Sequence, residues 1–352
     1  MSKTLMKGNE ALALAAIKGG CTHFFGYPIT PQNEIPEFLA REFPRTGGVF
    51  LQAESELAAI NMVYGAAAAG GRPMTSSSSP GIALMQEGMS SLAAAELPCV
   101  IVNVQRGGPG IGTIQPSQAD YYQMTRGGGN GDYRILSFAP STVQEGAEMM
   151  MAAFDLAEIY RTPVFIVSDG MLGQMMEPVE LPEKTHRELP AKDWLAVGHG
   201  GKRKPNTVKT LALDPIVLEQ RNLDLQAKYA RIAAAETRWE SYRTEGAEII
   251  LCAYGSTARI ARNAIDLLAA EKITAGLIRP QTLWPFPVAA FEGLPESCRM
   301  ILTVEMSCGQ MVDDVRLAVN GRLPVAFYGR SGGIIPVPEE IAAKVKNLLG
   351  RA

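Results

Sequence analysis

The sequence predicts a protein with two α/β domains, the first built around a parallel sheet. In the first half of the 352-residue chain, short β-branched segments alternate with longer stretches of small residues at helical spacing. The same alternation returns after residue 246. A stretch without hydrophobic period, rich in Pro, Lys and Glu, separates the two regions. At roughly 150 residues per domain, the length accommodates this organisation.

The first domain is expected to cover residues 1–176. Residues 1–20 have a basic start and a short apolar stretch, which indicates an amphipathic helix and not a signal peptide. Residues 98–105 are the clearest strand, because a β-branched run follows a proline. Further strands are expected over 22–29, 47–52, 72–79, 134–140 and 162–169, and further helices over 55–71, 81–96 and 141–161.

Residues 177–245 are expected to connect the domains. Residues 177–206 have no period, and their basic run at 201–204 favours a solvated loop over a partner-binding patch. Residues 215–242 are typical of a long surface helix that bridges two domains. The second, smaller domain is expected over 246–352, with strands at 248–256, 274–280, 300–307 and 323–329 and helices at 257–271 and 338–349.

Composition excludes several classes of function. Lys plus Arg is 33 and Asp plus Glu is 36, a net charge of −3, which argues against a nucleic-acid partner. No apolar run reaches the roughly 18 residues that a membrane span needs. The five cysteines are scattered, which is typical of a reducing cytoplasm. Without a C-x-x-C pair they form no iron–sulfur or zinc site within this chain.

The first candidate for binding is Thr30, within the segment 27–32. It leaves a strand and precedes a proline, so it is a natural N-cap. The free backbone N–H groups at such a helix end bind anions, for example a substrate carboxylate. A plain cap is the simpler interpretation on this spacing alone. Pro36 complicates both interpretations of Thr30, the anion site and the plain cap, because it would kink a helix that starts at Thr30.

The second candidate is Glu56, in the first turn of an Ala-rich helix after Ser55 as the cap. A glutamate there usually only complements the helix dipole. The functional alternative is a carboxylate at the carboxyl end of a strand, able to bond the ring nitrogen of a ligand.

The third candidate is Arg106, which follows the strand at 98–105 and opens a glycine-rich loop. A lone arginine at a strand end is usually a solvent residue, but beside glycines it could fork onto a carboxylate. The loop at 107–131 is long for a compact domain, and long ordered loops are usually functional. The serines at 76–79 form another strand end rich in hydroxyls, whereas Asp169–Gly170 is interpreted as a turn.

Together these segments resemble one family. Residues 27–31, 52–70, 79–88, 102–113 and 126–140, in this order, are similar to the α-type subunit of 2-oxoacid:ferredoxin oxidoreductases. Residues 279–287 resemble the transketolase C-terminal-like domain of the same subunits. The resemblance covers essentially the whole chain and is closest to subunits acting on 2-oxoisovalerate or 2-oxoglutarate. It leaves the role of the loop at Gly127–Asp132 open.

The resemblance implies a fold, a cofactor and roles for named residues. The first domain would be the pyrimidine-binding half of a thiamine diphosphate site, in which Glu56 bonds the aminopyrimidine N1′ and Pro28 and Ile29 also contact the cofactor. Thr30 and Arg106 would hold the substrate carboxylate. The reaction would be CoA-dependent oxidative decarboxylation of a 2-oxo acid to acyl-CoA and CO₂, with electrons passed to ferredoxin.

The resemblance also implies partners, because the chain lacks both the diphosphate and Mg²⁺ signature and the cysteines for 4Fe–4S clusters. These groups would reside on a diphosphate-binding β subunit and on ferredoxin-like and γ-type subunits, so the chain alone would be inactive. Two alternatives stay open: a subunit of a split, non-redox thiamine diphosphate enzyme of the transketolase or synthase kind, or a non-catalytic α/β binding module.

Overall fold

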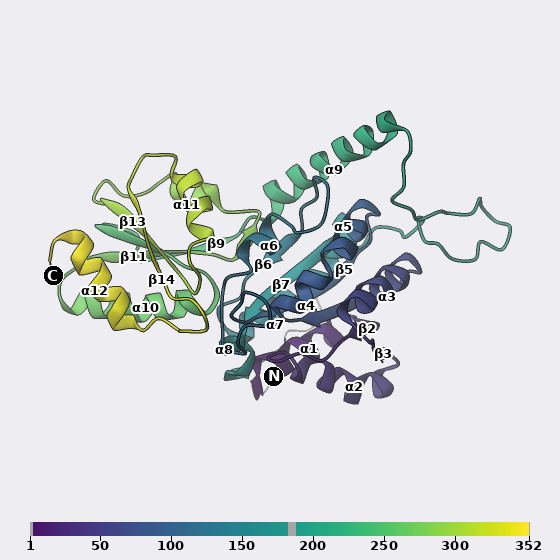
Figure 1. The fold of residues 1–352 in the computed structure, drawn as a ribbon, viewed down its shortest axis with the longest axis horizontal. Helices are drawn as coiled ribbons and strands as arrows, with labels where there is room; N and C mark the ends of the chain where they lie inside the picture. Colours follow the sequence, from purple (N-terminus) through teal and green to yellow (C-terminus); the bar gives the residue numbers. More distant parts are fainter. Residues whose placement is uncertain (1–2, 182–187, 352) are drawn as a thin grey trace.

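The computed structural model describes residues 3–181 and 188–351, which form two α/β domains joined by a long helix (Figure 1). The first domain contains a seven-stranded sheet in the order β12-β6-β7-β5-β4-β2-β3. The parallel strands are β2 (His23–Gly26), β3 (Val49–Gln52), β4 (Pro73–Ser77), β5 (Cys99–Gln105), β6 (Leu136–Phe138) and β7 (Pro163–Asp169). The predicted parallel α/β architecture is therefore confirmed.

Two helical layers cover this sheet (Figure 1). One layer contains α1 (Gly8–Lys18), α2 (Glu34–Thr46) and α7 (Val143–Tyr160); the other contains α3 (Glu56–Ala68), α4 (Ser79–Leu84) and α5 (Gln86–Ala94). Successive side chains of β5 point to opposite faces of the sheet. Val100 and Val102 pack with the layer of α1, α2 and α7, and Ile101 packs with the layer of α3, α4 and α5.

The N-terminus differs from the predicted single amphipathic helix. Strand β1 (Thr4–Lys7) pairs antiparallel with β8 (Met176–Val179), and α1 begins only at Gly8. Helix α1 packs against both α2 and α7. The alanines and Leu12 of α1 are buried on several sides, since both neighbouring helices cover them. Small side chains on α1 allow this close approach. The expected helix at 81–96 is also interrupted, at Met85 between α4 and α5.

The second domain is a five-stranded sheet in the order β14-β13-β10-β11-β9. Its parallel strands are β10 (Ile249–Cys252), β11 (Ala275–Pro280), β13 (Met300–Glu305) and β14 (Val325–Gly329). Helices α10 (Gly255–Ala270) and α12 (Pro338–Leu349) cover one face, while η1 (Val288–Phe291) and α11 (Met311–Val319), which was not predicted, cover the other.

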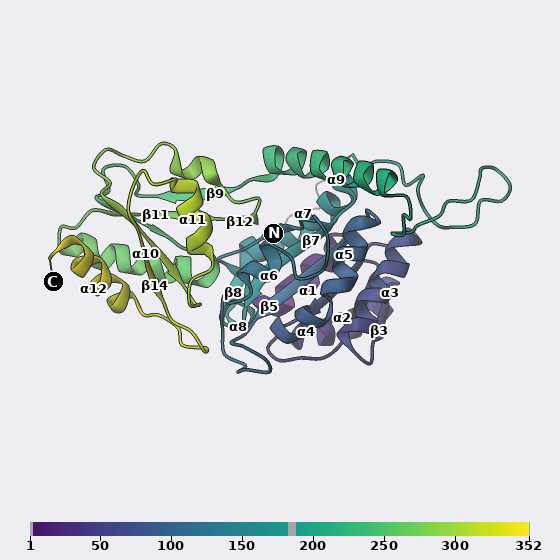
Figure 2. The ribbon, with the colours of Figure 1, turned by 45° about the horizontal axis from the view of Figure 1, so that its top comes forward.

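The predicted bridging helix is present as α9 (Pro215–Glu236), which lies along the first domain and leads to the second (Figure 2). It ends earlier than expected, and Trp239–Tyr242 become the antiparallel edge strand β9. Buried Lys228 anchors the helix by a 3.0 Å bond between its Nζ and the carboxylate of Glu96. Within the described residues, no helix is long and apolar enough to cross a membrane.

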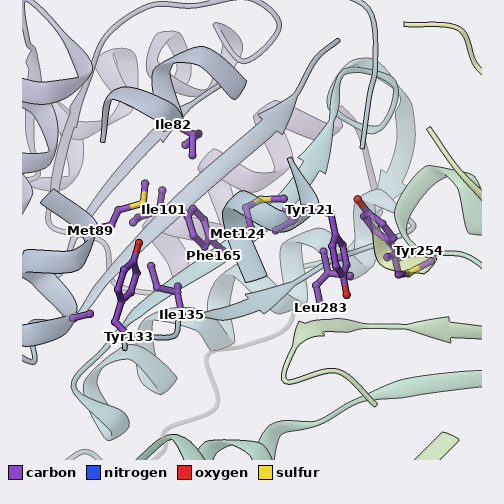
Figure 3. Close-up of a cluster of buried hydrophobic side chains, with 14 of the residues drawn as sticks. Ile82, Met89, Ile101, Tyr121, Met124, Tyr133, Ile135, Phe165, Tyr254 and Leu283 are labelled. Carbon is purple, nitrogen blue, oxygen red and sulfur yellow. The ribbon is translucent and has the colours of Figure 1, made fainter. Parts of the chain in front are cut away.

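The two domains share one apolar core (Figure 3). Tyr121 of α6 (Tyr121–Thr125) lies 5.9 Å from the ring of Tyr254 in the second domain. Strand β12 (Thr282–Trp284) follows β11 in the sequence but pairs antiparallel with β6 at the edge of the first sheet. A strand from the second half of the chain therefore forms the edge of the first domain's sheet. The order of the elements along the chain did not predict this pairing.

Candidate active site

The candidate site lies where four neighbouring parallel strands end. Strands β3, β2, β4 and β5 are adjacent, so their carboxyl ends meet at one edge of the sheet. In open α/β sheets, ligands bind at this edge. The segments that follow β3, β2 and β5 carry Glu56, Thr30 and Arg106, respectively, and the serines at 76–79 form the end of β4 and the residues after it. The fold therefore brings all three candidate residues to one edge.

Thr30 is not the N-cap that its spacing predicted. Helix α2 begins at Glu34 after Asn33, because a turn intervenes in which Gln32 N donates to Ile29 O at 3.1 Å. Pro36 then falls in the first helical turn, where a proline is tolerated. Thr30 instead contributes its carbonyl oxygen, which accepts a 2.8 Å hydrogen bond from Arg106 Nη1.

Pro28 and Ile29, the other two residues expected to contact the cofactor, belong to the same loop as Thr30. Pro28 is exposed and Ile29 is half-buried. Pro28 borders a hollow of about 260 Å³ between α2 and β3, whose other lining residues include Pro36, Phe50 and Gln52.

Glu56 is the first residue of α3, and the predicted cap before it is present. Ser55 Oγ accepts from Ala58 N at 3.2 Å. The Glu56 side chain is 5% exposed, although a charged carboxylate is rarely so buried without a partner. Ser77 Oγ of β4 donates to its Oε1 at 3.3 Å. A Cβ at Gly81 would overlap both of these side chains, so only glycine leaves the space beside the carboxylate.

Arg106 is 7% exposed, and its guanidinium is fixed by two backbone carbonyls. Nη1 donates to Thr30 O, and Nη2 donates to Ile111 O at 2.9 Å. The buried Nε has no hydrogen-bond partner within the described residues. A buried cationic donor without a partner is costly and indicates a ligand that supplies the acceptor.

The glycine-rich loop after Arg106 is compact and ordered. Gly107 N donates to Gln115 O at 2.9 Å, and Thr113 N donates to Gly107 O at 2.8 Å. Gly112 has φ +55°, and a Cβ there would overlap the Gly107 carbonyl, so the loop requires glycine at this position. This closed shape carries Ile111 O back to the guanidinium of Arg106.

Asp120, which the sequence pattern did not indicate, is linked to the Arg106 backbone through Ser79 Oγ. Its Oδ2 accepts from Ser79 Oγ at 2.5 Å and from Asn103 Nδ2 at 3.0 Å. Burial raises the pKa of Asp120, and these two hydrogen bonds lower it only in part. The only signal in the sequence was its place in a long loop, which does not reveal a partner 41 residues away.

The same loop is bound to the second domain through Gln118, which was also not predicted. Its Nε2 donates to Tyr254 O at 2.9 Å, and its Oε1 accepts from Thr257 Oγ1 at 2.6 Å and from Met306 N at 3.0 Å. The second domain thus fixes the loop that begins at Arg106.

One further segment, at the end of β7, completes the edge, whereas the Gly127–Asp132 loop precedes the parallel strand β6 and so lies toward the opposite edge. Asp169 was interpreted as a turn residue, but it is the N-cap of α8 (Gly170–Gln174), with Oδ1 accepting from Met171 N at 2.9 Å. Burial raises the pKa of Asp169. The Gly127–Asp132 loop packs on α5 and α9, with Gly128 N donating to Gln86 Oε1 and Gln226 Nε2 donating to Asp132 O.

Comparison with known proteins identifies the class. Residues 14–243 match the family described as pyruvate flavodoxin/ferredoxin oxidoreductase, thiamine diphosphate-binding. Residues 247–341 match core domain II of pyruvate:ferredoxin oxidoreductase. The chain belongs to this oxidoreductase family, and its first domain is a thiamine diphosphate-binding domain. The predicted family resemblance is confirmed.

Curated relatives match over nearly the whole chain. It is 47% identical over 350 residues to ketoisovalerate oxidoreductase subunit VorB of Methanothermobacter thermautotrophicus, covering 99% of both chains. It is 36% identical over 375 residues to 2-oxoglutarate synthase subunit KorA of Methanothermobacter marburgensis, covering 97% of this chain and 98% of the relative. These relatives are subunits of oxidoreductases of 2-oxo acids.

Two solved structures share the fold. One is the 2-oxoglutarate:ferredoxin oxidoreductase from Magnetococcus marinus with 2-oxoglutarate, coenzyme A and succinyl-CoA bound; it is 29% identical with a TM-score of 0.90. The match covers 98% of this chain and 65% of that chain. The other is a split-gene transketolase, at 15% identity and a TM-score of 0.58, which shows the fold alone. The predicted transketolase-like architecture is confirmed.

Proposed function

We propose that this chain is the pyrimidine-side subunit of a 2-oxoacid:ferredoxin oxidoreductase that oxidatively decarboxylates branched-chain 2-oxo acids of the 2-oxoisovalerate type. Coenzyme A would take the acyl group and ferredoxin the electrons. The higher identity to the ketoisovalerate oxidoreductase subunit than to the 2-oxoglutarate synthase subunit supports the branched-chain substrate.

One observation carries the proposal: Arg106 and the Thr30 segment meet at the carboxyl edge, and the buried guanidinium Nε finds no acceptor among residues 3–181 and 188–351. The Thr30 and Ile111 carbonyls accept from Nη1 and Nη2 and so fix the position of the guanidinium. A 2-oxo acid carboxylate would accept from Nε and so complete its hydrogen bonding. In this proposal Arg106 binds the carboxylate, and Thr30 holds the guanidinium in place through its backbone carbonyl.

Glu56 fits the cofactor that the family implies. Its carboxylate is buried and accepts a hydrogen bond from Ser77 Oγ, and it packs so closely on Gly81 that a Cβ there would overlap it. In this proposal it bonds the pyrimidine ring nitrogen, with Pro28 and Ile29 along the same edge. Thiamine diphosphate, when bound, supplies the electron sink for loss of CO₂. Thr30, Glu56 and Arg106, each with its segment, are referred to below as the half-site.

The surface around the half-site supports a partner subunit. Large apolar side chains are exposed on the segments of this edge: Leu57 at 49%, Leu84 at 56%, Ile111 at 82% and Ile114 at 56%. Apolar side chains gathered around a site indicate a protein interface. We propose that the diphosphate-binding β subunit covers them and brings Mg²⁺, and that ferredoxin-like and γ-type subunits carry the 4Fe–4S clusters. All five cysteines of this chain are free thiols, which supports a cytoplasmic complex.

The test is anaerobic affinity purification of the chain from its own cells, followed by assays of the complex with 2-oxoisovalerate, 2-oxoglutarate and pyruvate. We expect a brown complex that prefers 2-oxoisovalerate. Glu56→Gln should abolish turnover while the complex stays intact, whereas Glu54→Gln, at the exposed neighbouring carboxylate, should leave turnover unchanged. A colourless homo-oligomer, or full activity of Glu56→Gln, would favour the split non-redox enzyme or the binding module.

A further inference from the structure

The serines that end β4 are buried at the centre of the half-site. Ser76, Ser77 and Ser78 are fully buried, and Ser79 is 8% exposed. Strand β4 lies between β2 and β5, whose following loops carry Thr30 and Arg106. Buried hydroxyls are almost always hydrogen-bonded, so the partners of this run indicate what it does.

Ser76 holds the segment that carries Thr30. Its Oγ donates to Gln32 Oε1 at 2.6 Å, and Gln32 Nε2 donates to Tyr27 O at 3.3 Å. Tyr27 and Gln32 are the two ends of the loop in which Thr30 lies. One hydroxyl therefore braces both ends of that loop.

Ser77 holds Glu56. Successive residues of a strand point to opposite faces of the sheet, so Ser76 and Ser77 serve different layers. Ser76 reaches Gln32, two residues before α2, and Ser77 reaches the first residue of α3, where its Oγ donates to Glu56 Oε1. Gly81 allows this contact, because any side chain there would displace the hydroxyl.

Ser79 holds the backbone of Arg106 through the amide of that residue. Its Oγ accepts from Arg106 N at 3.0 Å and lies 3.1 Å from Arg106 O. The hydroxyl proton points either to that carbonyl or to Asp120 Oδ2 at 2.5 Å. The shorter distance and the negative charge favour Asp120, so the carboxylate orients the hydroxyl that accepts from Arg106 N. Ser78 Oγ, in contrast, has no partner in the described part of the chain.

We propose that Ser76, Ser77 and Ser79 are positioning residues, each of which aligns one segment of the half-site. Ser76 sets the Thr30 loop, Ser77 sets the Glu56 carboxylate and Ser79, oriented by Asp120, sets Arg106. The inference rests on the proposed function, because the proposed function is what assigns the three segments to substrate and cofactor. Serine suits the task, since it has few rotamers to lose and is small enough for neighbouring segments to approach.

The experiment separates the two ligands in the purified complex. Thiamine diphosphate affinity is measured by calorimetric titration of cofactor-depleted complex, and the KM for 2-oxoisovalerate is measured at saturating cofactor. Ser77→Ala should weaken thiamine diphosphate binding roughly five- to tenfold and leave that KM within about twofold. Ser79→Ala should do the reverse, with the KM raised roughly five- to tenfold at nearly unchanged cofactor affinity.

Ser137→Ala is the matched control. Ser137 Oγ is also fully buried and donates to backbone carbonyls, at Met124 and Ile135, but it lies on β6 outside the half-site. It should alter neither quantity. If both half-site variants shift both quantities together, or if neither differs from Ser137→Ala, the positioning role is overturned.

A second variant, Asp120→Asn, tests the Ser79 contact if Ser79→Ala does not assemble. The wild-type complex separates failure of this inference from failure of the proposed function. Asp120→Asn should raise the KM in the same direction but less, because an amide oxygen still accepts from Ser79. An unchanged KM there overturns the assignment of Ser79. A wild-type complex that binds no thiamine diphosphate and turns over no 2-oxo acid refutes the proposed function itself, and the inference with it.

Discussion

Arg106 offers the most direct test of the carboxylate site. In Arg106→Ala, the 2-oxo acid loses at least the donor Nε, which is buried and unpaired. A hydrogen bond to a charged group contributes about 1.5–3 kcal/mol, which corresponds to roughly 10- to 150-fold in kcat/KM. The carboxylate leaves as neutral CO₂, so its grip on the arginine does not strengthen in the transition state. The loss should therefore fall mainly on KM, with kcat changed by less than about threefold.

The geometry also predicts how the KM for the 2-oxo acid changes among variants of Arg106. A lysine at this position keeps the charge, but its single nitrogen cannot span the Thr30 and Ile111 carbonyls and still fork onto a carboxylate. Arg106→Lys should therefore raise KM about tenfold, between wild type and Arg106→Ala.

The assay follows dye reduction by the anaerobic complex over a range of 2-oxoisovalerate concentrations. The control is Arg134→Ala, which removes an exposed arginine whose guanidinium donates to the carbonyl of its neighbour Tyr133 and lies outside the half-site. A KM for Arg106→Ala that stays within twofold of the control would refute the carboxylate role. So would a loss confined to kcat, because it would place Arg106 in the chemical step and not in substrate binding.

Three further outcomes follow from the structure. Gly81→Ala should strongly weaken thiamine diphosphate binding in the calorimetric titration, because its Cβ would displace the Glu56 carboxylate; unchanged affinity would contradict this packing. Arg279→Ala should lower the free energy of unfolding by about 3–5 kcal/mol in chemical denaturation, since it leaves Glu145 without its bidentate partner, whose bonds are 2.9 and 2.8 Å; a loss below about 1 kcal/mol would count against it. Burial raises the pKa of Asp120 above its ordinary 3.8, so the folded state binds its proton first and wild type gains stability as pH falls toward that value. Asp120→Asn lacks this gain, so the Tm difference (variant minus wild type) should decrease as the pH falls from neutral to the ordinary value of 3.8; a constant difference over that range would argue against a raised pKa.

Local sequence patterns predicted most of the helices and strands and the edge of the sheet at which the candidate site lies, but they missed β1, β9 and α11. Strand periods and helix caps depend on residues within a few positions of one another, as in the Ser55 cap on the helix that begins at Glu56. Parallel strands end at one edge wherever they pack, so Thr30, Glu56 and Arg106 could be placed there before any contact was known.

The tertiary structure decided which side chains meet. Thr30 offers a carbonyl to Arg106 instead of a helix cap, and the two residues are 76 positions apart. The partners of the β4 serines and the pairing of β12 with the first domain's sheet depend in the same way on how layers dock. Gln118 meets Tyr254 across 136 residues and a domain boundary. Such pairings are set by the register and packing of whole elements, which local sequence preferences do not encode.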